Sequence, residues 1–154
     1  MNAVSVKWAK LSDVECVVPL FDGYRQFYQK PSDLALSARI LTVRLQNNQS
    51  RVALAFDEQG EACGFAQLYP MFSSLAMSLE ATQVWLLNDL FVKPSARGLG
   101  VGKTLLDFVQ NWAADEKLGY LMLETAKTNV VAQKFYEAQG WRRDNDFYTY
   151  YYVL

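Results

Sequence analysis

Hydrophobic and polar positions in the first third of the chain predict one short strand followed by two helices. Alternation over Val4–Trp8 predicts the strand. The capping box at Ser12–Glu15 predicts that a helix begins there, and Pro19 lies inside the same helical run, where it predicts a kink or a division of the helix. A second helix is expected from Ser32 to Leu45, where a cluster of polar residues ends it.

The middle of the chain predicts a β-hairpin and one further strand. Arg51–Phe56 and Ala62–Leu68 are apolar stretches on either side of the turn sequence Asp57–Gly60. Trp85–Val92 is the next apolar stretch, and it ends just before Lys93-Pro94. We therefore expect three strands in succession here.

The last third predicts a helix, a strand, a second helix and a closing strand. A helix is expected from about Gly102 to Lys117, and Tyr120–Thr125 predicts a strand. Asn129–Gln139 predicts a helix that ends at Gly140, and Phe147–Val153 alternates as the closing strand. The apolar stripe of the first of these helices consists of Val101, Leu105, Phe108, Val109 and Trp112. The periodicity favours a mixed sheet covered by helices in a single domain, residues 1–154.

A glycine loop joins the strand that ends at Val92 to the helix that follows. The sequence Arg97-Gly98-Leu99-Gly100-Val101-Gly102-Lys103 alternates glycine with other residues. Glycines remove side chains where a phosphate must approach the backbone, and the start of a helix offers unpaired N–H groups to that anion. The loop predicts a phosphorylated cofactor; an ordinary strand-to-helix turn, the alternative, needs only one glycine.

Two common nucleotide-binding patterns do not fit this loop. A Walker P-loop needs a glycine where this chain has Arg97, five residues before Gly102. The dinucleotide pattern needs a third glycine where the chain has Lys103 or Leu105. What remains is Arg-x-x-Gly-x-Gly, formed by Arg97, Gly100 and Gly102.

The remaining pattern and a second segment together resemble a known family. The segment from Asn129 to Trp141 has the form N-x-x-A-x-x-F-Y-x-x-x-G-aromatic. With the glycine loop in the expected order, it resembles the GNAT N-acetyltransferase superfamily, most specifically over Val84–Trp141. The resemblance implies an α/β (α+β) GNAT fold, with a mixed central sheet whose central strands splay apart, and acetyl-CoA as the cosubstrate without a metal.

The resemblance also implies which residues hold the cofactor. Backbone groups at the end of the strand before the loop pair with pantetheine, and an N–H near Leu90 polarises the thioester carbonyl. N–H groups from Gly98 to Lys103 bind the pyrophosphate, and Arg97 adds positive charge. Asn129 contacts the cofactor, although it also suits a helix N-cap. The implied cofactor-binding residues are Leu90, Phe91, Val92, Arg97, Gly98, Leu99, Gly100, Val101, Gly102, Lys103 and Asn129.

Two residues are candidates for acid–base catalysis. Tyr136, which periodicity alone would place in the core, corresponds in the resemblance to the general acid that protonates the departing thiolate. Asn88 and Asp89 are polar residues within an apolar strand, so one should face the substrate cleft. Asp89 is then a general base or the holder of a water; alternatively, it only hydrogen-bonds the backbone.

Acceptor recognition is expected in the first helical region. Tyr24, Arg25 and Tyr28, together with Asn88, are the candidate substrate residues. A polyamine would need several acidic groups, which Asp22, Asp33, Glu80 and Asp89 supply. Arg25 instead favours a carboxylate-bearing acceptor such as an amino acid. The resemblance points to the branch of small-amine, diamine and polyamine acetyltransferases, so we expect a small primary amine. Two alternatives stay open: a protein or peptide N-acetyltransferase, and a non-catalytic acetyl-CoA sensor.

Composition excludes several other classes of protein. The 154 residues carry a formal net charge of −1 and no broad basic stripe, which argues against nucleic acid as a partner. The absence of histidine excludes Ser-His-Asp catalysis and histidine-based zinc sites. Cys16 and Cys63 suit a reducing compartment, and with no apolar span we expect a cytoplasmic protein without a membrane partner. Aromatic residues on both faces of Phe147–Val153 predict a homodimer; the alternative is a strand covered within one chain.

Overall fold

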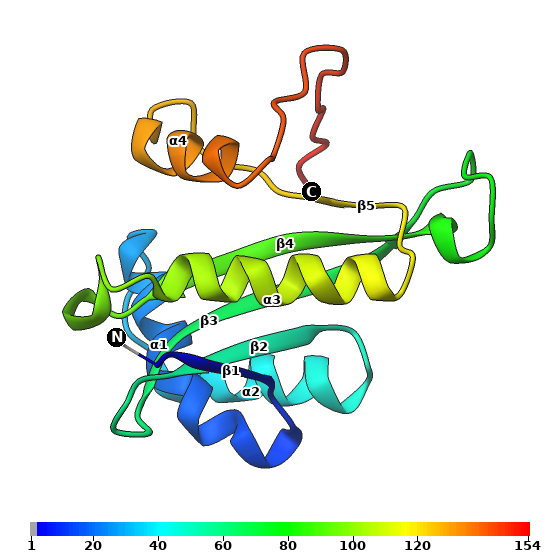
Figure 1. Ribbon diagram of the computed structural model, residues 1–154. Helices are drawn as coiled ribbons and strands as arrows, with labels where there is room; N and C mark the ends of the chain where they lie inside the picture. Colours follow the sequence, from blue (N-terminus) through cyan, green and yellow to red (C-terminus); the bar gives the residue numbers. More distant parts are fainter. Residues whose placement is uncertain (1–2) are drawn as a thin grey trace. The chain divides into compact units, whose positions relative to one another are not determined.

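The computed structural model describes residues 3–154 as two compact units, one ending at Leu123 and the other running from Glu124 to Leu154. The first unit is built on a five-stranded sheet with the strands in chain order (Figure 1). Its strands are β1 (Ser5–Trp8), β2 (Arg51–Phe56), β3 (Ala62–Phe72), β4 (Gln83–Val92) and β5 (Tyr120–Met122). Its α-helices are α1 (Val14–Phe27), α2 (Leu34–Gln46) and α3 (Val101–Asp115).

The sheet is mixed, as the periodicity predicts. β1 to β4 pair antiparallel, whereas β4 and β5, which α3 connects, pair parallel. The parallel pairing joins only Val84–Leu86 to Tyr120–Met122. Beyond that point, β4 continues to Val92 with no strand on this side within residues 3–154. The last part of β4 therefore presents an open backbone edge.

Helices cover both faces of the sheet (Figure 1). On one face, α1 and α2 pack on Leu54 and Phe65, and the core there also includes Val17 and Leu41. Because successive residues of a strand point to opposite faces, Gly64 lies on the other face. A Cβ on Gly64 would come within 3.0 Å of the Val101 side chain of α3. Glycine at this position thus lets α3 pack closely on the sheet.

The structure corrects one expectation for the first helix. Pro19 does not divide it, because α1 is continuous from Val14 to Phe27. A proline inside a helix removes one backbone hydrogen bond and costs roughly 3 kcal/mol. Val17 and Phe21, on either side of Pro19, are buried in the core, and their packing offsets that cost.

The predicted closing strand is also wrong. Residues 142–154 form neither helix nor strand, and β5 is shorter than the predicted Tyr120–Thr125. Alternating aromatic residues favour a strand, but a strand needs a neighbour to pair its backbone groups. The second unit, residues 124–154, contains no other strand, and its regular element is the helix α4 (Val130–Ala138). Within it, the Tyr151 hydroxyl donates a 3.2 Å hydrogen bond to Glu124.

No helix within residues 3–154 is both long enough and apolar enough to span a bilayer.

Candidate active site

The glycine loop has the backbone shape that the sequence predicts. A short 3-10 helix, Pro94–Ala96, leads into the loop, and α3 begins at Val101. Gly98 and Gly100 have φ angles of 79° and 81°, in the left-handed region that side chains disfavour. Two of the three alternating glycines are therefore required by backbone conformation alone.

The start of α3 offers backbone donors to an anion. Gly100 is the N-cap, and no side chain caps the helix. The Thr104 N–H donates to the Gly100 carbonyl at 3.0 Å, so helical hydrogen bonding begins at Thr104. The N–H groups of residues 101–103 come before Thr104 and take no part in the helical hydrogen bonds. They lie at the positive end of the helix dipole. Such an arrangement can bind an anion, and the diphosphate stays a prediction.

The two cations of the loop are both held by neighbours. The Arg97 Nε donates to the Val92 carbonyl at 3.1 Å, and its guanidinium lies 5.7 Å from the centre of the Phe91 ring. The Lys103 Nζ pairs with Asp107 at 2.6 Å on the exposed surface of α3. Arg97 is thus fixed at the end of β4, whereas the charge of Lys103 is partly neutralised.

A pocket of about 300 Å³ lies beside this loop. Leu99 and Val101 line one side of it, and Asp57 and Glu58 of the β2–β3 turn line another. Lys93, also in its wall, lies 3.7 Å from the Asp57 carboxylate. The acidic side of the pocket does not suit a phosphate, so we do not assign the diphosphate to it.

A bulge in β4 separates the two polar residues that the sequence singles out. Asp89 pairs with Gln67 across the sheet, but the next pair is Leu87 with Leu68, so Asn88 has no partner on β3. Asn88 is exposed and Asp89 is 3% exposed. The two residues therefore differ in environment, and the bulge lies on the part of β4 with the open backbone edge.

Asp89 is a buried carboxylate held by neutral donors. Gln67 Nε2 donates to one carboxylate oxygen at 2.6 Å, and Asn88 Nδ2 donates to the other at 2.9 Å. None of the ion pairs within residues 3–154 includes Asp89. Burial raises the pKa of Asp89, and the hydrogen bonds offset part of that rise. A carboxylate with a raised pKa is suited to accept a proton near neutral pH.

Tyr24 of α1 lies at the same bulge. Its hydroxyl donates to the Asn88 carbonyl at 3.3 Å. The Tyr24 ring is packed against Phe65 and Tyr28, with centroids 6.0 and 4.9 Å away. Burial, and next the charge of Asp89, raise the pKa of Tyr24. The structure thus brings Tyr24, Asn88 and Asp89 together.

The other two acceptor candidates are placed differently. Tyr28 is exposed and contacts Tyr24 through its ring. Arg25 has a buried Nη1 atom that finds no hydrogen-bond partner within residues 3–154. A guanidinium nitrogen without a partner is suited to a carboxylate, the ligand that the geometry of arginine matches best.

Two further residues near Asp89, Gln67 and Tyr69, were not identified from the sequence as site residues. Gln67 is fully buried, and its Oε1 has no hydrogen-bond partner in the described part of the chain. Tyr69 lies near Asp89; burial, followed by the charge of Asp89, raises its pKa to about 12. The sequence did contain a signal for Gln67, because it is a glutamine inside the apolar stretch Ala62–Leu68. A polar side chain there must find a partner, and the partner is Asp89.

Asp22 and Asp33 have structural roles that the polyamine hypothesis did not anticipate. Asp22 is 3% exposed and accepts hydrogen bonds from the Ser32 hydroxyl at 2.6 Å and the Asp33 N–H at 2.8 Å. Gln26 Nε2 and the Ser37 hydroxyl also donate to it. Asp33 caps α2 by accepting from the Leu36 N–H. The Asp22 carboxylate thus joins α1 to α2, and the Asp33 carboxylate is occupied in capping α2.

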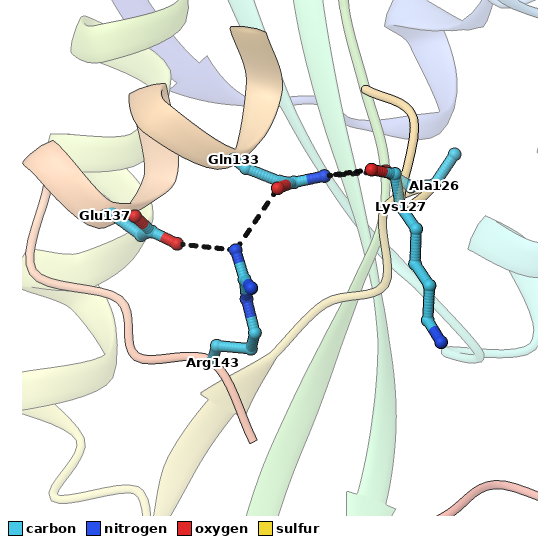
Figure 2. Close-up of polar contacts among 5 residues, drawn as sticks. All are labelled: Ala126, Lys127, Gln133, Glu137 and Arg143. Atoms are coloured by element: carbon cyan, nitrogen blue, oxygen red, sulfur yellow. Dashed lines mark hydrogen bonds and ion pairs between the residues drawn. The ribbon is translucent and has the colours of Figure 1, made fainter. Parts of the chain in front are cut away.

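The second unit carries the segment from Asn129 to Trp141. Asn129 caps α4 by accepting from the Ala132 N–H at 3.2 Å, which confirms the N-cap. Gln133 donates to the Ala126 and Lys127 carbonyls, and Arg143 donates to both Gln133 and Glu137 (Figure 2). These contacts brace the turns on both sides of α4, the helix that carries Tyr136.

The ring of Tyr136 lies 5.4 Å from that of Phe135 and 6.0 Å from that of Trp141, measured between centroids. The Trp141 N–H donates to the Tyr136 carbonyl at 3.1 Å, after Gly140 turns the chain with a φ of 92°. The helix therefore ends at the glycine, as the sequence predicts.

Both cysteines are free thiols, Cys16 exposed and Cys63 buried. Burial raises the pKa of the Cys63 thiol, which disfavours the nucleophilic thiolate.

Comparison with known proteins gives consistent matches. The sequence profile described as "Acetyltransferase (GNAT) family" matches residues 17–141. The uncharacterized N-acetyltransferase YhfO of Bacillus subtilis strain 168 is 40% identical over 147 residues, 96% of this chain and 95% of that protein. The D-amino-acid N-acetyltransferase HPA3 of Saccharomyces cerevisiae is 31% identical, with 96% of this chain and 90% of the relative covered. A crystal structure of a probable acetyltransferase matches with a TM-score of 0.89 at 36% identity, over 97% of each chain.

Proposed function

The chain belongs to the acetyltransferase (GNAT) family and is an acetyl-transferring enzyme, and from this premise we propose that its acceptor is the primary amine of a small molecule. The donor in this proposal is acetyl-CoA, which supplies the acetyl group as a thioester. The observation that carries the proposal is the buried carboxylate of Asp89 in the β4 bulge, beside an open backbone edge. This carboxylate can serve as the base that removes a proton from an amine acceptor.

The chain's own groups fit the cofactor at two places. The unpaired edge of β4, with Leu90, Phe91 and Val92, offers backbone N–H and C=O groups to an extended amide chain such as pantetheine. The uncapped start of α3 offers N–H groups to the diphosphate. Arg97, fixed at the end of β4, adds positive charge nearby.

The proposed chemistry is direct transfer. A primary amine arrives largely as the ammonium, because an alkylamine has a pKa near 10. Asp89 takes the proton, since its raised pKa favours the protonated state that results. Backbone N–H groups near Leu90 stabilise the oxyanion, and Tyr136 protonates the departing thiolate. The role of Tyr136 rests on the motif in which it lies.

Among small amines, the contacts described above favour an amino acid as the acceptor. Two of the four acidic residues suggested for a polyamine, Asp22 and Asp33, are occupied by structural hydrogen bonds. Of the other two, Glu80 is exposed in the short 3-10 helix before β4, whereas Asp89 lies in the β4 bulge and can serve one amine. Arg25 has an unpaired donor for one carboxylate. The yeast relative is named a D-amino-acid N-acetyltransferase, which agrees with this choice. Diamines and polyamines are the competing acceptors within the same proposal.

Three further expectations belong to the proposal. The chain acts as a single catalytic domain over residues 1–154, it forms a homodimer in which residues 147–153 take part, and it works in the cytoplasm. Size-exclusion chromatography with light scattering, on the native chain and on a chain truncated after Asp146, tests the homodimer: truncation should yield monomers.

The test of the acceptor is thiol release from acetyl-CoA over a panel of D- and L-amino acids, diamines, polyamines and a lysine peptide. We expect release with amino acids, and mass spectrometry should find one added acetyl group on the acceptor. Release with the lysine peptide alone would contradict the small-molecule proposal. Tight acetyl-CoA binding without release on any acceptor would favour the sensor alternative. Tyr136→Phe, assayed on the best acceptor, should lower the rate; an unchanged rate would remove it as the essential acid.

A further inference from the structure

The helix α4 has little apolar packing to hold it. It is nine residues long, and none of its residues is buried. An isolated helix of that length is marginal in water, because forming its first turn fixes several backbone angles for a single hydrogen bond. Other contacts must therefore keep α4 folded and fix the direction of the side chains that it carries, Tyr136 among them.

Gln133 connects α4 to the chain that precedes it. Its side-chain Nε2 donates to two backbone carbonyls, that of Ala126 at 3.0 Å and that of Lys127 at 2.9 Å (Figure 2). The two N–H bonds of an amide group match these two acceptors. Both carbonyls lie before the N-cap, Asn129, so one side chain closes the turn through which the chain enters the helix.

Arg143 connects the same glutamine to the chain that follows α4. Its Nη2 atom donates to Gln133 Oε1 and to Glu137 Oε1, each at 3.2 Å (Figure 2). Gln133 and Glu137 lie one turn apart on the same face of the helix, so a single nitrogen can contact both. We call the side chains of Gln133, Glu137 and Arg143 the α4 clamp. The α4 clamp ties the segments before and after the helix to one face of it.

The α4 clamp lies next to Tyr136 on the helix. Tyr136 is three residues after Gln133 and directly precedes Glu137, so it borders the face that the clamp holds. Trp141, two residues before Arg143, packs on the Tyr136 ring, with the centroids 6.0 Å apart. The contact of Arg143 with α4 therefore limits how far Trp141 can move from Tyr136.

The other cations of the second unit make no such contact. Lys127, Lys134 and Arg142 are exposed, and none of the ion pairs within residues 3–154 includes them. Within residues 124–154, Arg143 is the cation that pairs with an acid, Glu137. The chain thus places two arginines side by side, of which only Arg143 holds the helix.

We propose that Arg143, acting through Gln133 and Glu137, is a positioning residue that sets the direction of the Tyr136 hydroxyl for acetyl transfer. The inference rests on the proposed function, in which that hydroxyl gives its proton to the departing thiolate. Arg143 touches none of the reacting atoms. Exposed ion pairs stabilise a protein little, so the clamp should affect the rate of transfer and not the global free energy of unfolding.

Arg143→Ala tests the positioning role, with Arg142→Ala as the matched control. We expect kcat to fall about tenfold in Arg143→Ala, because a misdirected acid slows the chemical step, while the KM for the acceptor stays at its native value. The control removes an adjacent arginine and should keep the native kcat. Arg143→Lys should recover most of the rate, since both contacts of Arg143 use one nitrogen and an ammonium can donate to two acceptors. A native kcat in Arg143→Ala, or equal losses in Arg143→Ala and the control, would overturn the proposal.

A double variant separates the positioning of Tyr136 from a general effect on the fold. Tyr136→Phe has no hydroxyl to direct, so adding Arg143→Ala to it should change kcat by less than about twofold. A further tenfold loss, or so, in the double variant would show that Arg143 acts on something else, which would overturn the proposal. A native rate in Tyr136→Phe alone would overturn it as well.

Amide hydrogen exchange tests the structural half of the proposal without turnover. The N–H groups of residues 133–138 should exchange faster in Arg143→Ala than in the native chain or in Arg142→Ala, while exchange in α3 should be the same in all three. Unchanged exchange in α4 would overturn the clamp even if the variant were slow. If the native chain acetylates no amine, the proposed function fails and the positioning role fails with it; hydrogen exchange then reports separately whether Arg143 holds α4.

Discussion

The side-chain amide of Gln67 donates a 2.6 Å hydrogen bond to the carboxylate of Asp89, while its own carbonyl oxygen stays buried without a partner. An unpaired buried acceptor costs roughly 1–3 kcal/mol. An amide can turn over, so that it accepts from a protonated Asp89 as readily as it donates to the ionised form. Gln67 can thus support the carboxylate on both sides of a proton transfer.

Replacing Gln67 by leucine should shift the pH dependence of catalysis. Its hydrogen bond lowers the pKa of Asp89, so without that bond the pKa rises further. The acidic limb of the profile of kcat/KM against pH should therefore move to higher pH. Gln46→Leu, at the exposed end of α2, is the control and should leave the limb in place. An unmoved limb in Gln67→Leu would show that Asp89 does not set it.

Asp89→Asn should be more stable than the native chain at pH 7. The folded pKa of Asp89 lies above its unfolded value, so the unfolded chain releases this proton more readily. The native chain therefore loses stability as pH rises from about 4 through the folded pKa. Urea unfolding should show a gain on the order of 1 kcal/mol for the asparagine variant at pH 7, and no gain below about pH 4. A gain of the same size at both pH values would contradict the assignment.

Asp22 should show the opposite pH dependence. Its pKa is lowered, first by the hydrogen bond from Ser32, so its contribution to stability is present above about pH 4 and is lost as pH falls through the folded value. Asp22→Ala should cost about 1–3 kcal/mol at pH 7, because it leaves the buried Ser37 hydroxyl and the partly buried donors of Ser32 and Asp33 without this acceptor. Chemical unfolding measures the loss, with Asp115→Ala at the end of α3 as the control.

Two glycines of the loop should respond differently to alanine. Gly100 has a positive φ, so Gly100→Ala should lower stability by about 1 kcal/mol and also weaken acetyl-CoA binding. Gly102 lies inside α3 without a positive φ, and Gly102→Ala should keep or raise stability. Its new methyl group would still crowd the approach of the diphosphate, so we expect about tenfold weaker binding. Calorimetric titration with acetyl-CoA measures both, and native affinity in Gly102→Ala would place the diphosphate elsewhere.

The sequence predicted the elements whose patterns are local. The periodic helices and the β2–β3 hairpin occur close to their expected bounds, and Asn129 caps α4 as its side chain favours. Features that depend on a distant partner were missed. The pairing of Gln67 with Asp89 follows from the register of β3 and β4, including a bulge that no local pattern marks. Three of the four hydrogen bonds to Asp22, those from Ser32, Asp33 and Ser37, depend on how α1 meets α2.

Residues 147–153 show that a local pattern can also predict an element that does not form. Residues 147–153 have the composition of a strand, but strand formation depends on a neighbour that the second unit does not contain. Local propensity therefore predicted an element that the structure lacks.

The central claim, that Asp89 is the base for acetyl transfer, is tested most directly by Asp89→Asn assayed on the best acceptor. Thiol release should be followed alongside acetyl-CoA affinity and the unfolding midpoint. We expect a folded chain with native acetyl-CoA affinity whose transfer is at least about 100-fold slower at pH 7. A folded asparagine variant that transfers acetyl groups at the native rate would contradict the account.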